Sequence, residues 1–347
     1  MPKDRTKAGS HAVFTGLGDG EQIHYKCMKD MMGGFFGLEL PSYNNFPYAE
    51  GPGCACVSSG RSAFELLLRH MPRPDKIWIP RYICNTVLQA PQRLGIPIAY
   101  YSCTDQLVPE LPPAGANDLV LLVNYFGLTG SAVAAAAESL PCACIVDATT
   151  ALYCPPLPGL PAFYSPRKFC GVADGGIAIA PFALQNLPPK PEPGAPQSYY
   201  LLERLESGAM AALPGSERSE AALNAAPRKM NRLTRQLLKS IDFEAAAARR
   251  LENYGILHEA LADINHLQLP AYPHYAPMCY PLVSGIPGMR DSLIDSGIAL
   301  PVFWPEVIEA TDASTTENML SRKLLPLPLD QRYSEADMKR LISLILA

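Results

Sequence analysis

The sequence predicts a three-layer α/β/α fold in which helices cover both faces of a mostly parallel sheet, with a smaller α/β lobe at the C-terminal end. Short apolar runs bounded by turn residues recur through the first half of the chain, as buried strands do. Segments with helical periodicity lie between them, and this alternation is typical of repeated strand–helix–strand units. The strand candidates are residues 77–79, 96–101, 119–123, 144–146 and 176–180, and the helix candidates are residues 62–70, 86–94 and 131–139.

We expect two domains, a large one over residues 1–240 and a small one over residues 241–347. The segment LQNLPPKPEPGAPQ (184–197) predicts an exposed loop, because its prolines deny the chain regular structure. Residues 217–261 are rich in Ala, Leu, Arg and Glu and predict two long helices with a break near Pro227. An amphipathic helix over 334–345, after the apolar segment LLPLPL, suits the smaller lobe.

The bulk composition favours a small, specific substrate. The 347 residues are 48% hydrophobic, which is enough for a large core. The 29 basic and 33 acidic residues leave a net charge of −4, which excludes a general electrostatic attraction to nucleic acid or anionic membranes. The start of the chain, MPKDRTKAGSH, is charged, and no apolar run reaches the length of a membrane span, so we expect a cytoplasmic protein.

The ten cysteines are dispersed along the chain, and we expect reduced thiols rather than disulfides. The two Cys-x-Cys pairs, Cys54/Cys56 and Cys142/Cys144, lie in apolar alternating stretches, where a spacing of two puts both thiols on one strand face. No nearby histidine completes a zinc set. We therefore interpret these cysteines as small buried hydrophobic residues and predict no metal site.

A serine–glycine turn comes directly before the helix predicted over 62–70. In Ser59-Gly60-Arg61, a hydroxyl and free backbone N–H groups stand at the positive end of that helix, where they could bind a phosphate. For this motif alone, a simple helix-capping role of Ser59 is more common.

An acid and a lysine follow later strands. Asp147 comes straight after the apolar run 143–146, and ligands of open α/β sheets gather at the carboxyl ends of strands. An acid at that place can keep a pyridine nitrogen protonated, although it could equally cap the next segment. Lys168 stands between apolar and aromatic residues before a Gly-Gly turn, and partial desolvation beside Arg167 would lower its pKa, as a nucleophilic amine requires. Ser165 could reach the same phosphate as Ser59, while a solvated surface turn remains the alternative for this lysine.

The order of these three elements resembles that of the DegT-type sugar aminotransferases, pyridoxal-phosphate enzymes of the aspartate-aminotransferase fold group. The likeness extends to four further segments, GGFFGLEL, IPRYICNTV, VNYFG and LLPLPLDQRYSEADM. The resemblance implies pyridoxal 5'-phosphate as cofactor, with Lys168 as its Schiff-base lysine and Asp147 as the partner of its pyridine nitrogen. Ser59, Gly60 and Arg61 correspond to the phosphate-binding Ser-Gly-Thr turn, and Asp174-Gly175-Gly176 to a Glu-Gly-Gly motif.

The chain departs from the family pattern at several positions. Thr150 stands where the family has a glutamine that supports the cofactor ring. Phe163 replaces the usual phosphate-binding serine, for which Ser165 could substitute. Cys84 replaces the aromatic residue that stacks on the ring, with Tyr82 close by. By the resemblance, Asn231 would reach the phosphate held by a partner subunit, and helix capping is the alternative for this residue.

The resemblance implies a homodimeric aminotransferase with shared active sites that moves an amino group from an amino acid such as glutamate to a nucleotide-linked keto sugar, as in polysaccharide biosynthesis. The partners would be these small molecules, with no nucleic acid and no membrane. Two alternatives stay open: another pyridoxal-phosphate reaction, of the lyase or decarboxylase type, and a catalytically silent binding dimer with the same fold. Because some family members carry histidine in place of the lysine and act as dehydratases, Lys168 favours amino transfer.

Overall fold

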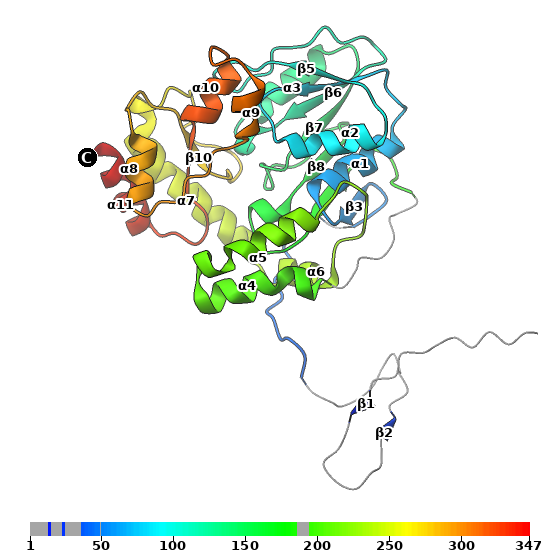
Figure 1. Cartoon of the computed structure of the whole chain (residues 1–347). Helices are drawn as coiled ribbons and strands as arrows, with labels where there is room; N and C mark the ends of the chain where they lie inside the picture. The colour runs from blue at the N-terminus through cyan, green and yellow to red at the C-terminus, as the bar shows by residue number, and fades with distance from the viewer. Residues whose placement is uncertain (1–12, 15–22, 25–35, 49, 186–193) are drawn as a thin grey trace, which may run out of the picture. The chain divides into compact units, whose positions relative to one another are not determined.

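The computed structural model describes residues 13–14, 23–24, 36–48, 50–185 and 194–347. The chain divides into two compact units, residues 1–40 and 41–347. In the first unit, β1 (Val13–Phe14) pairs with β2 (Ile23–His24) in antiparallel register. The second unit contains the remaining described helices and strands (Figure 1). Part of the GGFFGLEL segment and residues 186–193 of the expected loop lie outside the described residues.

A seven-stranded sheet forms the centre of the second unit, in the order β3-β9-β8-β7-β6-β4-β5. The five strands from β8 to β5 run parallel to one another, while β9 is antiparallel to both of its neighbours. The mostly parallel sheet predicted from the sequence is therefore confirmed. The strands are β3 (Cys54–Val57), β4 (Ile77–Pro80), β5 (Ile98–Tyr101), β6 (Leu119–Val123), β7 (Ala143–Asp147), β8 (Ala162–Tyr164) and β9 (Gly176–Ile179).

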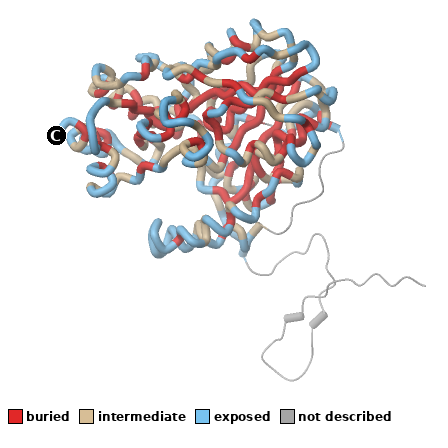
Figure 2. The backbone as a smooth tube through the Cα atoms, turned by 45° about the horizontal axis from the view of Figure 1, so that its top comes forward, coloured by how far each residue is buried: buried red, intermediate tan, exposed pale blue. Residues whose placement is uncertain are grey.

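Helices cover both faces of this sheet, as the alternation of buried strand side chains requires. Leu121 of β6 packs in a core with α1 (Gly60–His70) and α2 (Gln89–Arg93). The next residue, Leu122, packs in a second core on the opposite face with α3 (Gly130–Ser139). Figure 2 shows the buried chain concentrated in this sheet and its flanking helices. The three-layer α/β/α arrangement is confirmed.

Four helices follow the sheet: α4 (Ala195–Ser207), α5 (Ala209–Ala222), α6 (Arg232–Lys239) and α7 (Phe243–Leu261). The expectation of two long helices over 217–261 is wrong in its detail. Helix α5 begins earlier, because Gly208 turns the chain with a positive φ of 87° between α4 and α5. The break around Pro227 spans residues 223–231, and a second break occurs where the Asp242 carboxylate accepts a hydrogen bond from the N–H of Ala245 and caps α7.

The start of α4 lies within the segment that we expected to be a loop. Pro196 is at its first turn, where proline has no intrahelical partner to lose and is tolerated. Helices α4 and α5 pack against each other as a hairpin, drawn in green in Figure 1.

The C-terminal part has a hydrophobic core of its own, which includes Leu257, Leu282, Leu327 and Leu341. Its strands β10 (Tyr280–Leu282) and β11 (Leu325–Leu327) pair in antiparallel register. Its last helix agrees with the predicted 334–345 segment, and a capping box between Ser334 and Asp337 explains its start. The domain boundary at 240/241 stays a prediction. The helices here are α8 (Met289–Asp295), α9 (Glu306–Ala310), α10 (Thr316–Lys323) and α11 (Glu335–Leu346).

Short 3₁₀ turns connect several of these elements: η1 (Asn85–Leu88), η2 (Tyr125–Gly127), η3 (Pro166–Lys168) and η4 (Ala262–Ile264). The cysteines within the described ranges are free thiols. Cys56 and Cys144 are buried in strands as expected, but Cys54, the first residue of β3, and Cys142, which precedes β7, are only half-buried, because both stand at strand ends. Among the described helices, none combines the length and the apolar character that crossing a membrane requires.

Replacing Gly176 with alanine tests how tightly β9 approaches the turn after β3. A Cβ at this position would lie 1.9 Å from the carbonyl oxygen of Ser59, so backbone must move. We expect G176A to lower the free energy of unfolding by about 3 kcal/mol or more. The matched control is Gly255 inside α7, where a Cβ meets nothing within 4 Å and G255A should change stability by no more than about 1 kcal/mol. Urea unfolding of both variants checks this, and equal effects would contradict it.

Candidate active site

A cavity of about 530 Å³ lies where the strands of one direction end, and its size is typical of a small-molecule site. The segments that follow β3, β4, β6, β7 and β8 all contribute to its lining, which is where ligands of open α/β sheets are expected. The C-terminal part closes it with residues around β10 and β11 and before α9. Eight of the nine site residues predicted from the sequence line it: Ser59, Gly60, Arg61, Cys84, Asp147, Thr150, Ser165 and Lys168.

One end of the cavity is formed by the first turn of α1. Ser59 caps this helix, since its Oγ accepts a hydrogen bond of 3.1 Å from the N–H of Ser62. The capping alternative is therefore correct for Ser59. The N-terminal end of this 11-residue helix nevertheless lines the cavity at Gly60, although Gly60 itself is buried. Ser165 is buried in the cavity wall, and Phe163 stacks on Phe64 at 4.9 Å instead of offering a hydroxyl.

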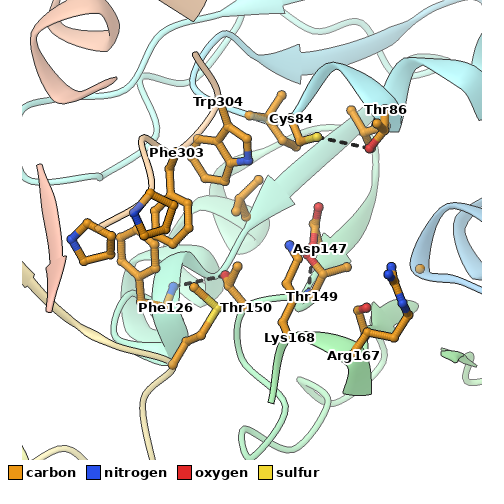
Figure 3. A pocket seen from close by; sticks show the side chains of 18 of the residues that line it. Cys84, Thr86, Phe126, Asp147, Thr149, Thr150, Arg167, Lys168, Phe303 and Trp304 are labelled. Carbon is orange, nitrogen blue, oxygen red and sulfur yellow. Dashed lines mark hydrogen bonds between the residues drawn. The ribbon is translucent and has the colours of Figure 1, made fainter. Parts of the chain in front are cut away.

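Lys168, Thr149 and Asp147 meet in the middle of the cavity (Figure 3). The Lys168 amine donates a 2.9 Å hydrogen bond to Oγ1 of Thr149, whose own N–H donates to Oδ1 of Asp147 at 2.8 Å. Lys168 is accessible from the cavity, but protein surrounds that cavity. Desolvation by this protein lowers the pKa of the amine, and the negative charge of Asp147 opposes the shift. Burial has the opposite effect on the Asp147 carboxyl and raises its pKa, although Lys168 and Thr149 oppose this shift.

The segment that carries Lys168 is held from the C-terminal side. Arg250 of α7 is buried, and its guanidinium lies over the ring of Phe169 at 4.9 Å. The carbonyl oxygen of Phe169 accepts hydrogen bonds from Gln331 at 3.0 Å and from Arg250 at 3.5 Å. Arg250 also donates to the carbonyl oxygen of Met278, which lines the cavity. These bonds connect the residue after the lysine to the segment before β10, which lines the cavity.

Thr150 lines the cavity, but its hydroxyl is engaged by the backbone. It donates to the carbonyl oxygen of Asn124 at 3.0 Å and accepts from the N–H of Phe126 at 3.1 Å. Phe126 has a positive φ of 58°, which is rare for a bulky residue and needs such support. Thr150 therefore holds the turn after β6 in place, and any support for a cofactor ring would come through that turn.

Aromatic residues form one wall of the cavity, on the side opposite Arg167 in Figure 3. Phe126 stacks on Phe303 at 5.5 Å, and Phe303 lies 5.9 Å from Trp304. Tyr82 does not line the cavity: it is fully buried behind Trp304, whose ring it meets edge-on at 4.5 Å. Cys84 does line the cavity, with its Sγ 3.1 Å from Oγ1 of Thr86.

Asn231, the ninth predicted residue, is not brought to this cavity within one chain. It stands at the start of α6, where its N–H donates to the buried Asp174 carboxylate at 2.9 Å and its side-chain amide donates to Gln197 at 3.3 Å. Its side chain does not cap the helix. It lines a separate cavity of about 50 Å³, and its role toward a partner subunit stays a prediction.

An ion cluster lies beside the α1 end of the cavity. Glu220, in the last turn of α5, contacts the guanidinium of Arg61 and also that of Arg167 at 2.5 Å. Partial burial raises the pKa of the Glu220 carboxyl, but the two guanidinium groups outweigh this and the net shift is downward.

Sequence reasoning missed Thr149, Glu220, Phe303 and Trp304. Thr149 stands beside Asp147 in the DATT segment and could have been considered from its position after a strand. The other three come from distant parts of the chain, where no local pattern connects them with the lysine. Only packing of the C-terminal part and of α5 against the sheet brings them to the cavity.

No protein-family model matches the chain, and no curated protein matches it in sequence. Solved structures do match. The sugar aminotransferase CalS13 from Micromonospora echinospora aligns with a TM-score of 0.60 and 15% identity over 84% of this chain and 86% of that one. A DegT DnrJ EryC1 StrS aminotransferase from Brucella abortus aligns with a TM-score of 0.58 and 16% identity over 84% and 85%.

A third match is the GDP-4-keto-6-deoxy-D-mannose-3-dehydratase of E. coli with bound hydrated PLP, which has a TM-score of 0.57 and 13% identity over 84% of this chain and 87% of that one. The chain therefore has the fold of the DegT-type sugar aminotransferases, the aspartate-aminotransferase-like fold of pyridoxal-phosphate enzymes.

Proposed function

We propose that the chain is a pyridoxal-phosphate-dependent aminotransferase that transfers an amino group from an amino acid such as glutamate to a nucleotide-linked keto sugar. The observation that carries this proposal is the meeting of the Lys168 amine and the Asp147 carboxylate in one cavity, with a helix N-terminus at its end. The structural matches include sugar aminotransferases, which supports this reaction over the silent-dimer alternative. They also include a sugar dehydratase, so the experiments below decide against the lyase alternative.

The residues of the cavity fit pyridoxal phosphate. Lys168 offers a desolvated amine to an aldehyde, and Asp147 offers a carboxylate to a pyridinium. The α1 turn offers N–H groups and hydroxyls to a phosphate. Nε of Arg167 is buried without a hydrogen-bond partner among the described residues, so this N–H could donate to a phosphate at the α1 end of the cavity. When bound, the cofactor would supply an electron sink for the bond that breaks at the substrate carbon.

In the proposed reaction Lys168 has two tasks. Its amine would hold the cofactor at the aldehyde carbon, and when it is free it would take and return the proton at the substrate carbon. A lowered pKa suits both tasks, because the neutral amine is the reactive form. The Thr149 hydroxyl, 2.9 Å from Nζ, steers that amine within the cavity.

Asp147 would hold the ring nitrogen of the cofactor and favour its protonated form through charge pairing. Burial raises the pKa of its carboxyl although Lys168 opposes this shift, and a pyridinium would further favour the carboxylate form. The Thr149 N–H orients it with a 2.8 Å hydrogen bond. Ser59, Gly60 and Ser165 would anchor the phosphate, and the wall formed by Phe126, Phe303 and Trp304 offers flat faces to a sugar ring or a base.

The homodimer and the cytoplasmic location expected from the sequence belong to this proposal as predictions. In a dimer, Asn231 would contact the phosphate that the partner subunit holds. Measurement of the oligomeric state tests the homodimer. Loss of cofactor in N231A tests the contact of Asn231 with the partner's phosphate.

Purified protein mixed with pyridoxal phosphate and then with amino acids tests the proposed function directly. We expect a yellow protein whose visible absorption falls when glutamate is added and returns when a nucleotide-linked keto sugar accepts the amino group. Formation of the amino sugar is measured by mass spectrometry. A coloured protein that no amino donor bleaches would favour the lyase alternative, and a protein that stays colourless would favour the silent dimer.

Lys168→Ala should abolish covalent attachment of the cofactor, because no other amine is placed beside Asp147 and Thr149 among the residues that line the cavity. Borohydride reduction followed by peptide mapping should find the modified lysine at 168 in the wild type and none in K168A. Modification at another lysine in the wild type would show that this assignment is wrong.

Asp147→Asn should retain the fold and the cofactor yet lower the rate of amino transfer by about 100-fold or more, since removing one preorganised electrostatic partner costs that much in comparable sites. The half-reaction with glutamate, followed by absorption, measures it. An unchanged rate would remove Asp147 from the mechanism.

The neighbouring threonines Thr149 and Thr150 separate a role at the lysine from a role in the fold. T149V removes the acceptor of the Lys168 amine, which disfavours the ammonium form, so the pH at which the lysine begins to react with pyridoxal phosphate should fall. T150V leaves this pH unchanged but should lower the free energy of unfolding by about 1–3 kcal/mol, because the backbone groups of Asn124 and Phe126 lose their partner. The two measurements are the rate of attachment as a function of pH and urea unfolding. A pH shift in T150V instead of in T149V would contradict these roles.

A further inference from the structure

The proposed function gives no role to Glu220, which forms an ion cluster with Arg61 and Arg167. Its two arginines come from separate places that both border the cavity. Arg61 is in the first turn of α1, and Arg167 directly precedes Lys168. Their side chains are only 12% and 19% exposed, so both guanidinium groups are held within the protein.

The end of α5 supplies acceptors to the donors around the α1 turn. Glu220 contacts both guanidinium groups, as described above. The carbonyl oxygen of Leu223 accepts a 3.2 Å hydrogen bond from Nη1 of Arg61, and that of Asn224 accepts one of 3.3 Å from Oγ of Ser59. The groups that could bind an anion at this end are thus in contact with the segment 220–224.

The charge of this cluster is not balanced. Two guanidinium groups face one carboxylate, and they lie beside the positive end of α1. The cluster keeps a net positive charge, and Nε of Arg167 has no hydrogen-bond partner among the described residues. The Glu220 side chain is 46% exposed, so its carboxylate can turn away from the arginines into solvent.

We infer that Arg61 and Arg167 form a binding site for a phosphate monoester dianion, and that the Glu220 carboxylate occupies this site and competes with the phosphate. This inference rests on the proposed function for the source of the phosphate, namely the cofactor. Guanidinium groups bind phosphate and carboxylate oxygens with the same paired geometry, so one can replace the other. A phosphate and the Glu220 carboxylate would repel each other at this place, so binding of one displaces the other.

Comparison of pyridoxal phosphate with pyridoxal, which lacks the phosphate, isolates this site. In Glu220→Gln the competing charge is gone, and pyridoxal phosphate should bind about tenfold or more tightly than to the wild type, while pyridoxal binds unchanged. Glu217→Gln, on the exposed surface of the same helix, is the matched control and should change neither affinity. Glu220→Ala should behave as Glu220→Gln does, and thermal melting shows that each variant is folded.

Arg61→Met and Arg167→Met complete the test. Each should weaken pyridoxal phosphate by about tenfold or more and leave pyridoxal unchanged. An E220Q variant that binds pyridoxal phosphate no more tightly than the wild type overturns the competition, since Glu220 would then only align the arginines. Arginine variants that lose both ligands equally, or neither, overturn the phosphate site.

Inorganic phosphate separates this inference from the proposed function. Its affinity, measured by calorimetry, should rise in E220Q and fall in R167M whether or not any aldehyde attaches to Lys168. If neither aldehyde attaches but phosphate follows this order, the proposed function fails and the site stands. If both aldehydes attach equally in every variant and phosphate does not follow the order, the function stands and the site inference fails.

Discussion

The candidate site depends on the close approach of the turn after β3 to the start of β9. The N–H of Gly175 donates a 2.7 Å hydrogen bond to the carbonyl oxygen of Ser58, and a side chain at Gly176 would overlap the backbone of Ser59. This approach places the first turn of α1 against the loop that carries Lys168. Without it, the start of α1 and the Lys168 amine would belong to separate parts of the surface.

Electrostatics divides the cavity into two functional ends. At one end, desolvation lowers the pKa of the Lys168 amine and raises the pKa of the Asp147 carboxyl. Each group is therefore less stable in its charged form than in water, and a ligand that compensates its charge would bind favourably. At the other end, two arginines and a helix N-terminus concentrate positive charge, and Glu220 offsets only part of it. The proposed cofactor, an aldehyde with a phosphate several bonds away, would match both ends at once.

Local sequence patterns predicted the central elements well where buried strands are continuous, as at residues 119–123, which agree with β6. These patterns predicted less accurately where one or two residues decide where a helix begins or ends. Gly208 and Asp242 set the limits of α4, α5 and α7, and neither stands out from a helix-rich composition. Thr150 was expected beside a cofactor ring, yet its hydroxyl is used by the backbone at Phe126. Such a contact joins residues 24 apart and cannot be inferred from either segment alone.

The sequence by itself determined the layer architecture and the chemical types at the strand ends, because strand and helix periodicity and the residue after each strand are local properties. It also located Lys168, Asp147 and the Ser59-Gly60 turn by their order along the chain. Only the tertiary structure decided that Thr149 faces the lysine, that Trp304 and Phe303 form a wall, and that Glu220 lies between two arginines. These contacts arise from packing between segments far apart in the chain, where side-chain direction and burial depend on the whole fold.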